Sequence, residues 1–446
     1  MPSTQSRRHF LKTIGGAGAS LQFVSLSATE SAPETQKRPQ PSETEAAAFA
    51  EGQNYWNQIA SQYDVERSVT NLENAYWGIM ARPVAAAYIE RIRFVNRVNV
   101  VYVRDAYASA LFSKDLENVR VEIARELGCS AAEIALTRSG TEALQNLIVN
   151  YSKLSPGDSV LYADLDFDAM QFAMDFVAHR RGANVVRLNI PEPASRANIL
   201  ETYDHVLRNS IRPKLLLLTH ISHRTGIVIP VAEIAAMARN QGVDTVVDAA
   251  QSWGQLDFKI SDLNADFVGF SLHKWIGAPL GTGCLYIKAS RLSDVDPHFD
   301  NRDWPRDDIR SRVLMGSSNF AAFLTVPDAL AFHRSIGPAH KEARLRYLRD
   351  YWVHRTRQIR NIQIITPDDP TLHAGITAFR FNQGSPNMAP IFLQKVLATK
   401  YGVLTAARKG IAKGDAIRVT PGLYNLEADL DQFVRALQDL TGVRHP

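Results

Sequence analysis

Apolar and polar residues alternate along this chain in two patterns. Short apolar runs without polar alternation, such as 215–218, are typical of strands that are buried on both faces of a parallel sheet. Longer stretches with helical periodicity, such as 231–240, lie between these runs. We therefore expect right-handed β–α–β units and a large α/β fold around a central, mainly parallel sheet.

The same patterns place the individual elements and two domains. Helices are predicted over residues 54–62, 84–95, 113–127, 142–151 and 231–240. Strands are predicted over residues 159–163, 184–188, 214–219, 245–248, 267–271 and 283–287. In the last third, a helix (339–361), two strands (375–381 and 416–419) and a helix (427–441) follow one another. We expect a large domain over 49–300, whose first segment packs on the other domain, and a smaller α+β domain over 301–446.

The first 48 residues show neither of these two patterns. Arg7 and Arg8 precede a weakly apolar stretch, 13–28, which is shorter than the roughly 20 apolar residues of a membrane span. This pattern predicts a bacterial signal peptide over 1–28, and the arginine pair followed by Phe-Leu-Lys resembles the twin-arginine type. A disordered basic tail is the alternative. Residues 29–48, with three prolines, are expected to be a disordered linker. We expect export to the periplasm by the twin-arginine translocase, without a membrane span in the mature protein.

Charge and cysteine content exclude several function classes. The net charge is +4 and the basic residues are scattered, whereas nucleic-acid binding usually needs a basic stripe on one face. We therefore expect no nucleic-acid partner. Cys129 and Cys284 lack the spacing of metal ligands, and the pair His220 and His223 has no evident third ligand, so no metal site is expected. A single disulfide between the two cysteines stays open.

Three segments place reactive or polar groups beside predicted strand ends and a helix start. One strand ends in Asp248, and another is followed by His273 and Lys274. Gly140 and Thr141 open a helix, where backbone N–H groups bind phosphate well. Each segment alone has an ordinary explanation, such as a turn cap or a solvated lysine. Together they supply an amine, a carboxylate and a phosphate cradle, the groups that pyridoxal 5′-phosphate (PLP) requires.

This set, in this order, resembles the class V aminotransferase family of fold-type I PLP enzymes over residues 71–440. Asp248-x-x-Gln251 and Ser271-x-His273-Lys274 are the most specific matches. The sequence most resembles the isopenicillin-N-epimerase-like branch, which includes exported siderophore-tailoring members. The resemblance implies PLP as cofactor, a fold-type I PLP-transferase architecture and a homodimer with shared active sites.

The resemblance also implies a role for each matching residue. Lys274 would form a Schiff base with PLP and later move the proton at the substrate α-carbon. Asp248 would pair with the ring nitrogen. The other implied cofactor contacts are Gly140, Thr141, Ser271 and His273 to the phosphate, Gln251 to the ring oxygen, and Ser317 of a second subunit to the phosphate.

Four further positions carry weaker signals. Phe167 matches a ring-stacking position, with a core phenylalanine as the alternative. His223 stands where many family members have asparagine near the cofactor oxygen, and an imidazole ordinarily titrates near neutral pH. Asn74, in the segment 72–78, would lie near the substrate. Arg418 would bind the substrate α-carboxylate through its planar guanidinium, with an exposed edge-strand arginine as the alternative.

These features predict a PLP-dependent enzyme that acts on the amino-bearing carbon of an amino acid or peptidyl amine, as an aminotransferase or epimerase. Desulfuration in this family uses a cysteine shortly before the substrate arginine, and residues 400–418 contain none. Siderophore tailoring, a desulfurase or lyase reaction, and a catalytically silent binding protein with the PLP fold are the alternatives. Retention of Lys274, Asp248, Gln251 and Arg418 together argues against the silent protein.

Overall fold

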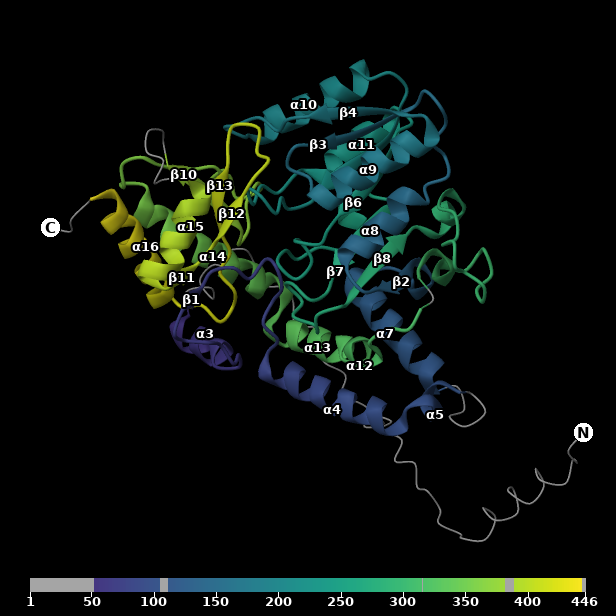
Figure 1. Ribbon diagram of the computed structural model, residues 1–446, viewed down its shortest axis with the longest axis horizontal. Coiled ribbons are helices and arrows are strands. Elements are labelled where there is room, and N and C mark those ends of the chain that lie inside the picture. Colours follow the sequence, from purple (N-terminus) through teal and green to yellow (C-terminus); the bar gives the residue numbers. More distant parts are fainter. Residues whose placement is uncertain (1–51, 105–110, 315, 382–388, 443–446) are drawn as a thin grey trace, which may run out of the picture. The chain divides into compact units, whose positions relative to one another are not determined.

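The computed structural model describes residues 52–104, 111–314, 316–381 and 389–442. The predicted signal peptide and linker lie outside these residues. A seven-stranded sheet, a four-stranded sheet and a two-stranded sheet organise the described chain (Figure 1).

The seven-stranded sheet has the order β2-β8-β7-β6-β5-β3-β4. Its strands are β2 (Ile134–Thr137), β3 (Ser159–Ala163), β4 (Asn184–Leu188), β5 (Pro213–Thr219), β6 (Asp244–Asp248), β7 (Phe267–Ser271) and β8 (Gly283–Ile287). Pairing is parallel from β7 through β4, and β8 runs antiparallel to both of its neighbours, β7 and β2. The expectation of a mainly parallel sheet is confirmed. The four-residue strand β2 was not predicted, because it is too short to carry a pattern.

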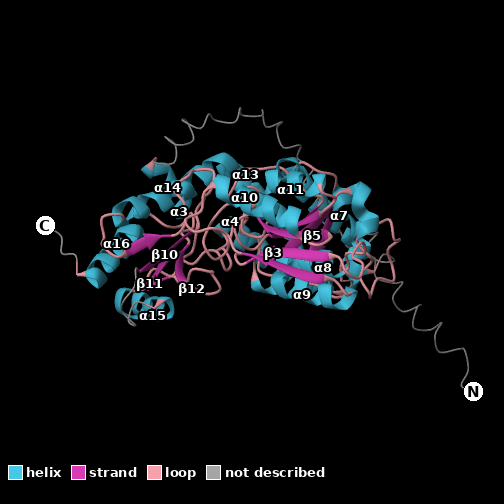
Figure 2. Cartoon of the chain, turned by 90° about the horizontal axis from the view of Figure 1, so that it is seen from above, coloured by secondary structure: helices cyan, strands magenta, loops and turns pink. Residues whose placement is uncertain are grey.

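Both faces of this sheet are covered by helices (Figure 2). On one face lie α10 (Arg196–Asn209) and α11 (Val231–Asn240), and on the other lie α8 (Gly140–Val149) and α9 (Asp168–Arg181). Strand β5 shows why its apolar run has no polar gaps. Leu216 and Leu218 belong to one hydrophobic core cluster, whereas Leu215 and Leu217 belong to the other. Every side chain of the run is therefore buried.

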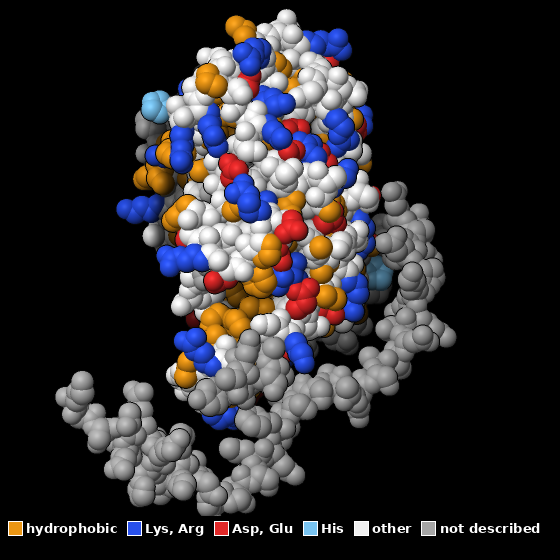
Figure 3. Space-filling model, turned by 90° about the vertical axis from the view of Figure 1, so that its right-hand side faces the viewer, with side chains coloured by type: hydrophobic (Ala, Val, Ile, Leu, Met, Phe, Trp, Pro, Cys, Tyr) orange, Lys and Arg blue, Asp and Glu red, His pale blue; other side chains and the backbone are white. Residues whose placement is uncertain are grey.

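Six further α-helices of the described chain precede α14 (Pro338–Thr356). They are α3 (Gln53–Ala60), α4 (Arg82–Val98), α5 (Val100–Val103), α7 (Leu111–Leu127), α12 (Phe320–Leu324) and α13 (Val326–Ile336). Helix α3 lies near α14 and α16 (Glu427–Thr441), with Arg344 over the Trp56 ring. Helices α12 and α13 both contact α4 and α7. Lys, Arg, Asp and Glu side chains are interspersed on the face drawn in Figure 3.

The second sheet is antiparallel, with the order β12-β13-β10-β9. Its strands are β9 (Ile362–Ile364), β10 (Thr377–Phe381), β12 (Ala406–Arg408) and β13 (Ala416–Val419), and its helices are α14 (Pro338–Thr356), α15 (Pro390–Tyr401) and α16 (Glu427–Thr441). The predicted helix over 339–361 is shorter than expected, ending at Thr356. The domain boundary at 300 stays a prediction.

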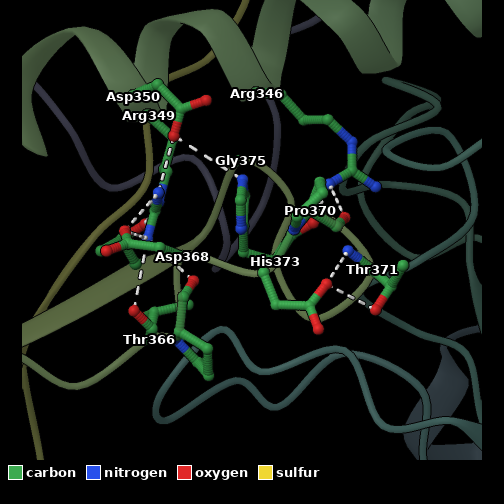
Figure 4. Close-up of polar contacts among 12 residues, drawn as sticks. Arg346, Arg349, Asp350, Thr366, Asp368, Pro370, Thr371, His373 and Gly375 are labelled. Atoms are coloured by element: carbon green, nitrogen blue, oxygen red, sulfur yellow. Dashed lines mark hydrogen bonds and ion pairs between the residues drawn. The ribbon is translucent and has the colours of Figure 1, made fainter. Parts of the chain in front are cut away.

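A buried arginine joins α14 to the loop before β10 (Figure 4). Arg349 Nε donates to Thr377 Oγ1 at 3.2 Å, and its Nη2 donates to the Thr366 carbonyl at 3.3 Å. The same loop reaches the large sheet, because Gly375 N–H donates to Gln255 Oε1 at 2.7 Å. Gln255 Nε2 in turn donates to the Gln251 carbonyl at 2.7 Å. The loop therefore ties the small sheet to the turn that follows β6.

The N-terminal segment of the described chain crosses to the C-terminal part. Strand β1 (Thr70–Asn71) pairs in parallel with β11 (Val403–Leu404), and the two lie side by side in Figure 1. Further along, Glu73 forms a bridge with Thr420, just after β13. Gly78 N–H then donates to the His273 carbonyl at 2.8 Å. One short segment thus contacts both the small sheet and the loop after β7.

Candidate active site

A cavity of about 510 Å³ lies at the carboxyl ends of three neighbouring strands of the large sheet. Thr219, Asp248 and Ser271, the last residues of β5, β6 and β7, all line it. This is the edge where open α/β sheets place their ligands, and the volume is typical of a small-molecule site. Nine of the predicted site residues line the cavity: Thr141, Phe167, His223, Asp248, Gln251, Ser271, His273, Lys274 and Arg418.

Lys274 enters this cavity from the turn that follows β7. Burial lowers the pKa of its amine to about 8, with Arg418 acting in the same direction and Asp248 opposing. A pKa close to neutrality leaves part of the lysine unprotonated at physiological pH. Only the unprotonated amine can attack a carbonyl group, so the environment prepares Lys274 as a nucleophile.

Asp248 supplies a buried carboxylate to the same cavity. Its Oδ1 accepts the N–H of Ala250 at 2.9 Å, which fixes the side chain at the end of β6. Burial raises the pKa of Asp248, while nearby Lys274 lowers it. A carboxylate that is held in this way can accept a hydrogen bond from a protonated ring nitrogen and stabilise its charge.

Helix α8 begins at the cavity with Gly140. The preceding Ser139 caps the helix by accepting the Glu142 N–H at 3.2 Å, and Gly140 N–H donates to Ser271 Oγ at 3.1 Å. A β-carbon at position 140 would lie 2.7 Å from Ser271 Oγ and 3.1 Å from Ala250 Cβ. The helix start can approach the strand end this closely only because residue 140 is glycine. Its N-terminal dipole then faces a small concave space that suits a phosphate.

His273 lies beside this helix start. Its Nδ1 is 3.0 Å from the Thr282 carbonyl oxygen, so Nδ1 carries the proton that donates. Burial, together with Lys274, lowers the pKa of His273 to about 4. The ring is therefore neutral at physiological pH, with Nε2 unprotonated. A bound anion would favour the protonated ring, because the added charge would be paired.

Gln251 is held by neighbours on both sides of its amide. Its Oε1 accepts the Trp275 indole N–H at 2.8 Å, and its Nε2 donates to the Ala75 carbonyl at 3.0 Å. An amide nitrogen has two protons. The second N–H of Gln251 can therefore donate to an oxygen of a molecule in the cavity, with the side chain already fixed.

Phe167 and His223 form an aromatic pair in the cavity wall. Their ring centroids are 5.1 Å apart at an interplanar angle of 83°, an edge-to-face arrangement. Burial, assisted by Arg418, holds the pKa of His223 well below its ordinary value. The neutral-range titration expected for an imidazole at this position is therefore wrong for this environment.

Arg418 reaches the cavity from β13 and is 1% exposed. Its Nη1 donates to the His223 carbonyl at 2.8 Å, and its Nη2 contacts Glu73 Oε1. Burial lowers the pKa of Arg418 to about 10, and Glu73 opposes that shift. The guanidinium therefore remains charged at physiological pH. The alternative of an exposed edge-strand arginine is wrong, because this side chain is buried.

Three predicted residues lie elsewhere. Gly140 belongs to the helix start described above. Asn74 is buried beside a second, much smaller cavity on which Lys274 and Tyr424 also lie, rather than in the main cavity. Ser317 is exposed and does not line the cavity of its own chain. Its contact with the cofactor of a second subunit stays a prediction.

Sequence patterns did not point to Arg408 or Glu73. Arg408 lines the cavity, and its Nη2 donates to Glu73 Oε1 at 3.1 Å. A signal for Arg408 was available, because it precedes a glycine-containing turn and the strand of Arg418. In the antiparallel pair β12–β13, Ala406 lies opposite Arg418, so Arg408 is a diagonal neighbour on the same face. Glu73 lies in the segment 72–78 that was expected at the active site, but its partners, more than 300 positions away, were not predicted.

The arrangement fits PLP. The cavity combines the amine of Lys274, the buried carboxylate of Asp248 and the glycine-based helix start at Gly140. PLP presents an aldehyde, a ring nitrogen and a phosphate, and each has a matching group here. Within the described ranges, no group of three or more His, Cys, Asp and Glu side chains could hold a metal ion.

The sequence of the chain decides its family. The family model of the class V aminotransferases matches residues 92–433. The chain belongs to this family. The predicted family and its cofactor, PLP, are therefore confirmed, and the chain is a class V PLP enzyme.

Curated relatives support the epimerase-like branch of class V. The chain is 28% identical to isopenicillin N epimerase of Streptomyces clavuligerus over 344 residues, which cover 73% of this chain and 85% of that one. It is 26% identical to isopenicillin N epimerase of Amycolatopsis lactamdurans, covering 86% and 98%. A probable cysteine desulfurase of Vibrio cholerae is also 26% identical, covering 74% and 83%.

Solved structures agree on the fold. The apo cysteine desulfurase from Thermococcus onnurineus superposes with a TM-score of 0.73 at 18% identity, covering 86% of this chain and 98% of that one. Cysteine desulfurase of Escherichia coli gives a TM-score of 0.73 at 22% identity, covering 86% and 99%. The predicted fold-type I architecture is confirmed.

Proposed function

We propose that this class V enzyme acts on the amino-bearing carbon of an amino acid or peptidyl amine, as an epimerase or aminotransferase. The observation that carries the proposal is the amine of Lys274, which shares one cavity with the buried carboxylate of Asp248. The pKa of Lys274, lowered by burial to about 8, suits an amine that must both attack and move protons near neutral pH. The similarity to isopenicillin N epimerases supports the epimerase alternative.

Each residue contributes a separate task. When bound, PLP supplies a ring that accepts the electron pair released at the substrate α-carbon. Asp248 holds the proton on the ring nitrogen, and Lys274 takes and returns the proton at the α-carbon. Arg418 orients the substrate by pairing with its carboxylate, which determines the bond that points toward Lys274. Phe167 presents an apolar surface without a titratable group.

Lys274→Ala tests the assignment directly. The variant should bind PLP without a covalent link, so borohydride treatment should leave its mass unchanged, whereas wild-type protein should gain one reduced cofactor on Lys274. Lys341→Ala is a useful comparison, because this second buried lysine has a pKa lowered by burial to about 7 but does not line the cavity. A reduced cofactor on another lysine in Lys274→Ala would overturn the proposal.

The two reaction types differ in where the α-proton returns. Epimerisation returns a proton to the same carbon, so incubation in D₂O should give the opposite stereoisomer with deuterium at that carbon. Transamination should instead release a keto product in a single turnover without an added acceptor. Mass spectrometry and chiral chromatography of the products distinguish these outcomes for each amino acid or peptide tested.

Cysteine desulfuration is the second candidate, because several relatives have that name. The segment 400–418, where the family places its reactive cysteine, contains no cysteine. Cys284 is buried in β8, Cys129 is partly buried, and both are unpaired. Neither lines the cavity. Release of sulfide from cysteine at a rate comparable with turnover of the best amine substrate would favour desulfuration over our proposal.

We further propose that the chain is exported by the twin-arginine pathway to the periplasm and works there as a homodimer. The support is the arginine pair Arg7 and Arg8 ahead of the weakly apolar stretch 13–28. Among the described helices, none combines the length and apolarity that a bilayer span requires. Replacing both arginines with lysine should leave folded protein in the cytoplasm. Undiminished periplasmic protein would contradict the export route, and sedimentation of a monomer would contradict the dimer.

A further inference from the structure

Two large aromatic side chains are exposed at the active-site cavity. Tyr76 is 66% exposed and Trp77 is 50% exposed, and both line the cavity that holds Lys274. Their ring centroids are 4.8 Å apart at an interplanar angle of 56°, so the two rings form one apolar surface. Leu280, which is also exposed, lines the same cavity. Clustered apolar side chains that a folded protein leaves exposed mark a binding surface.

The backbone holds the two rings in place. The carbonyl group that precedes Tyr76 accepts a hydrogen bond from Gln251 Nε2 at 3.0 Å. Directly after Trp77, the chain packs on the turn of Lys274, since a β-carbon at Gly78 would lie 2.0 Å from the Lys274 carbonyl oxygen. The segment is therefore fixed on both sides of the rings. A surface that is preorganised in this way loses little conformational entropy when a ligand covers it.

The rings lie toward solvent, whereas the reactive groups lie deeper in the cavity. Arg418 and Asp248 are both buried, and burial also dominates the environment of Lys274. A substrate that is held by its amine at Lys274 and by its carboxylate at Arg418 has its remaining part toward the open side of the cavity. The surfaces that meet this part there include the uncharged rings of Tyr76 and Trp77, which pack best against another flat ring.

The size and charge of this surface favour a small apolar occupant. A stable protein interface buries about 800 Å² on each partner, which three side chains cannot supply. One ring of a small molecule can be covered by two aromatic side chains. Arg138 also lines the cavity, but its guanidinium is already paired with Glu142 at 2.9 Å. A negative charge on this part of the substrate would therefore find no unpaired partner in Arg138.

We propose that Tyr76 and Trp77 form a specificity site for an aromatic ring, which the substrate carries at the end opposite its reacting amine. This inference rests on the proposed function, because the amine is taken to react at Lys274. The substrate class is then an amino acid, or a conjugate of one, that bears a distal aromatic ring. Small aliphatic amino acids lack the ring and should be poor substrates.

Two carboxylates without an amine test the site without any reaction. Phenylbutyrate carries a ring on its terminal carbon and butyrate does not, and isothermal titration calorimetry gives their dissociation constants for PLP-loaded protein. Wild-type protein should bind phenylbutyrate about tenfold more tightly than butyrate. Tyr76→Ala and Trp77→Ala should each reduce this preference to about threefold or less, and Tyr76→Phe, which keeps the ring, should retain it.

Phe172→Ala is the matched control. Phe172 is 70% exposed on α9 but does not line the active-site cavity, so its removal should leave the preference for phenylbutyrate at about tenfold. Cyclohexylbutyrate is equally apolar but not flat, and it should bind wild-type protein more weakly than phenylbutyrate. Since Tyr76 and Trp77 are at least half exposed, their alanine variants should fold as the wild type does.

Several results would overturn this inference. An unchanged preference for phenylbutyrate in both alanine variants would do so, as would equal binding of phenylbutyrate and butyrate to wild-type protein. Cyclohexylbutyrate binding as tightly as phenylbutyrate would show an apolar surface without selectivity for aromatic rings. Weaker self-association of the alanine variants in sedimentation, with an unchanged ligand preference, would show that a second copy covers the rings instead. The proposed function fails on a different result, namely that no amino compound changes the cofactor absorbance, and the ratio of the two carboxylate affinities does not depend on that result.

Discussion

Gly140→Ala should weaken PLP binding strongly while leaving the protein folded. The new β-carbon would lie 2.7 Å from Ser271 Oγ, 3.1 Å from Ala250 Cβ and 3.2 Å from the carbonyl carbon of Phe270. Ser271 can rotate away, but the backbone of Phe270 cannot. Overpacking of this kind costs about 1–3 kcal/mol.

Displacement of the helix start adds a second loss. A hydrogen bond to a charged group contributes about 1.5–3 kcal/mol, and the phosphate of PLP would lose at least one such contact with the N-terminal N–H groups of α8. A loss of about 3 kcal/mol corresponds to roughly 10²-fold weaker binding of the cofactor. Because the overpacking also acts on the cofactor-free protein, its unfolding temperature should fall by a few degrees.

Titration of cofactor-free protein with PLP, followed by visible absorbance, measures this loss. Gly375→Ala is a matched control, because its β-carbon would lie 3.1 Å from Gln255 Oε1 and from Leu345 Cβ but outside the cavity. Both variants should lose thermal stability, and only Gly140→Ala should lose PLP affinity. PLP dissociation constants for Gly140→Ala and wild type that agree within about twofold would refute the role of the helix start as a phosphate cradle.

Three further predictions follow from the same cavity. Asp248→Ala should retain some PLP but lose several orders of magnitude in turnover, because the ring nitrogen loses its buried carboxylate; near-normal turnover would reject this role. In cofactor-free protein, sulfate should bind more weakly as pH rises from about 5 to about 7, by at most about tenfold per pH unit. The reason is that a bound anion raises the pKa of His273 from about 4, so that binding of the anion takes up a proton. The linked affinity is fully present below the free-state pKa of about 4 and is lost as pH rises from that value to the bound-state pKa, and His273→Asn should show a flat profile; identical slopes in both proteins would contradict this linkage. Arg418→Ala should lower kcat/KM on a carboxylate-bearing substrate by about 10²-fold or more, and Arg418→Lys should recover little, because a point charge cannot reproduce the planar fork. Normal kinetics in the alanine variant would mean that the substrate lacks a carboxylate beside its amine.

Local pattern was enough to place six of the seven strands of the large sheet and the residues at their ends. The apolar runs that form β5, β6 and β7 end in Thr219, Asp248 and Ser271, and parallel strands bring such ends together by necessity. Lys274 lies three residues beyond β7, so its position at the cavity followed from the same reasoning. The fold class could therefore be inferred without knowing any long-range contact.

Local sequence pattern could not predict the contacts between distant segments. Glu73 acquires its partners from β12 and β13, and nothing in its neighbourhood along the chain indicates them. Asn74, one residue later, was expected near the substrate but lies beside the smaller cavity behind Lys274. The protonation of His223 was equally inaccessible, because its pKa depends on burial and on Arg418, which lies 195 positions away. The contacts and the pKa of such a residue depend on the folded surroundings and not on the residue type alone.

The separation between Glu73 and its partners also sets an order of events during synthesis. Glu73 and Thr420 are 347 positions apart, so at about 5–20 residues per second the ribosome needs roughly 20–70 s to make the second after the first. For most of that interval the partners of Glu73 are missing, and β1 has no β11 to pair with. Arg7 and Arg8 are synthesised before all of these residues. On the proposed export route, recognition of the arginine pair has to wait until these last residues are made and folded.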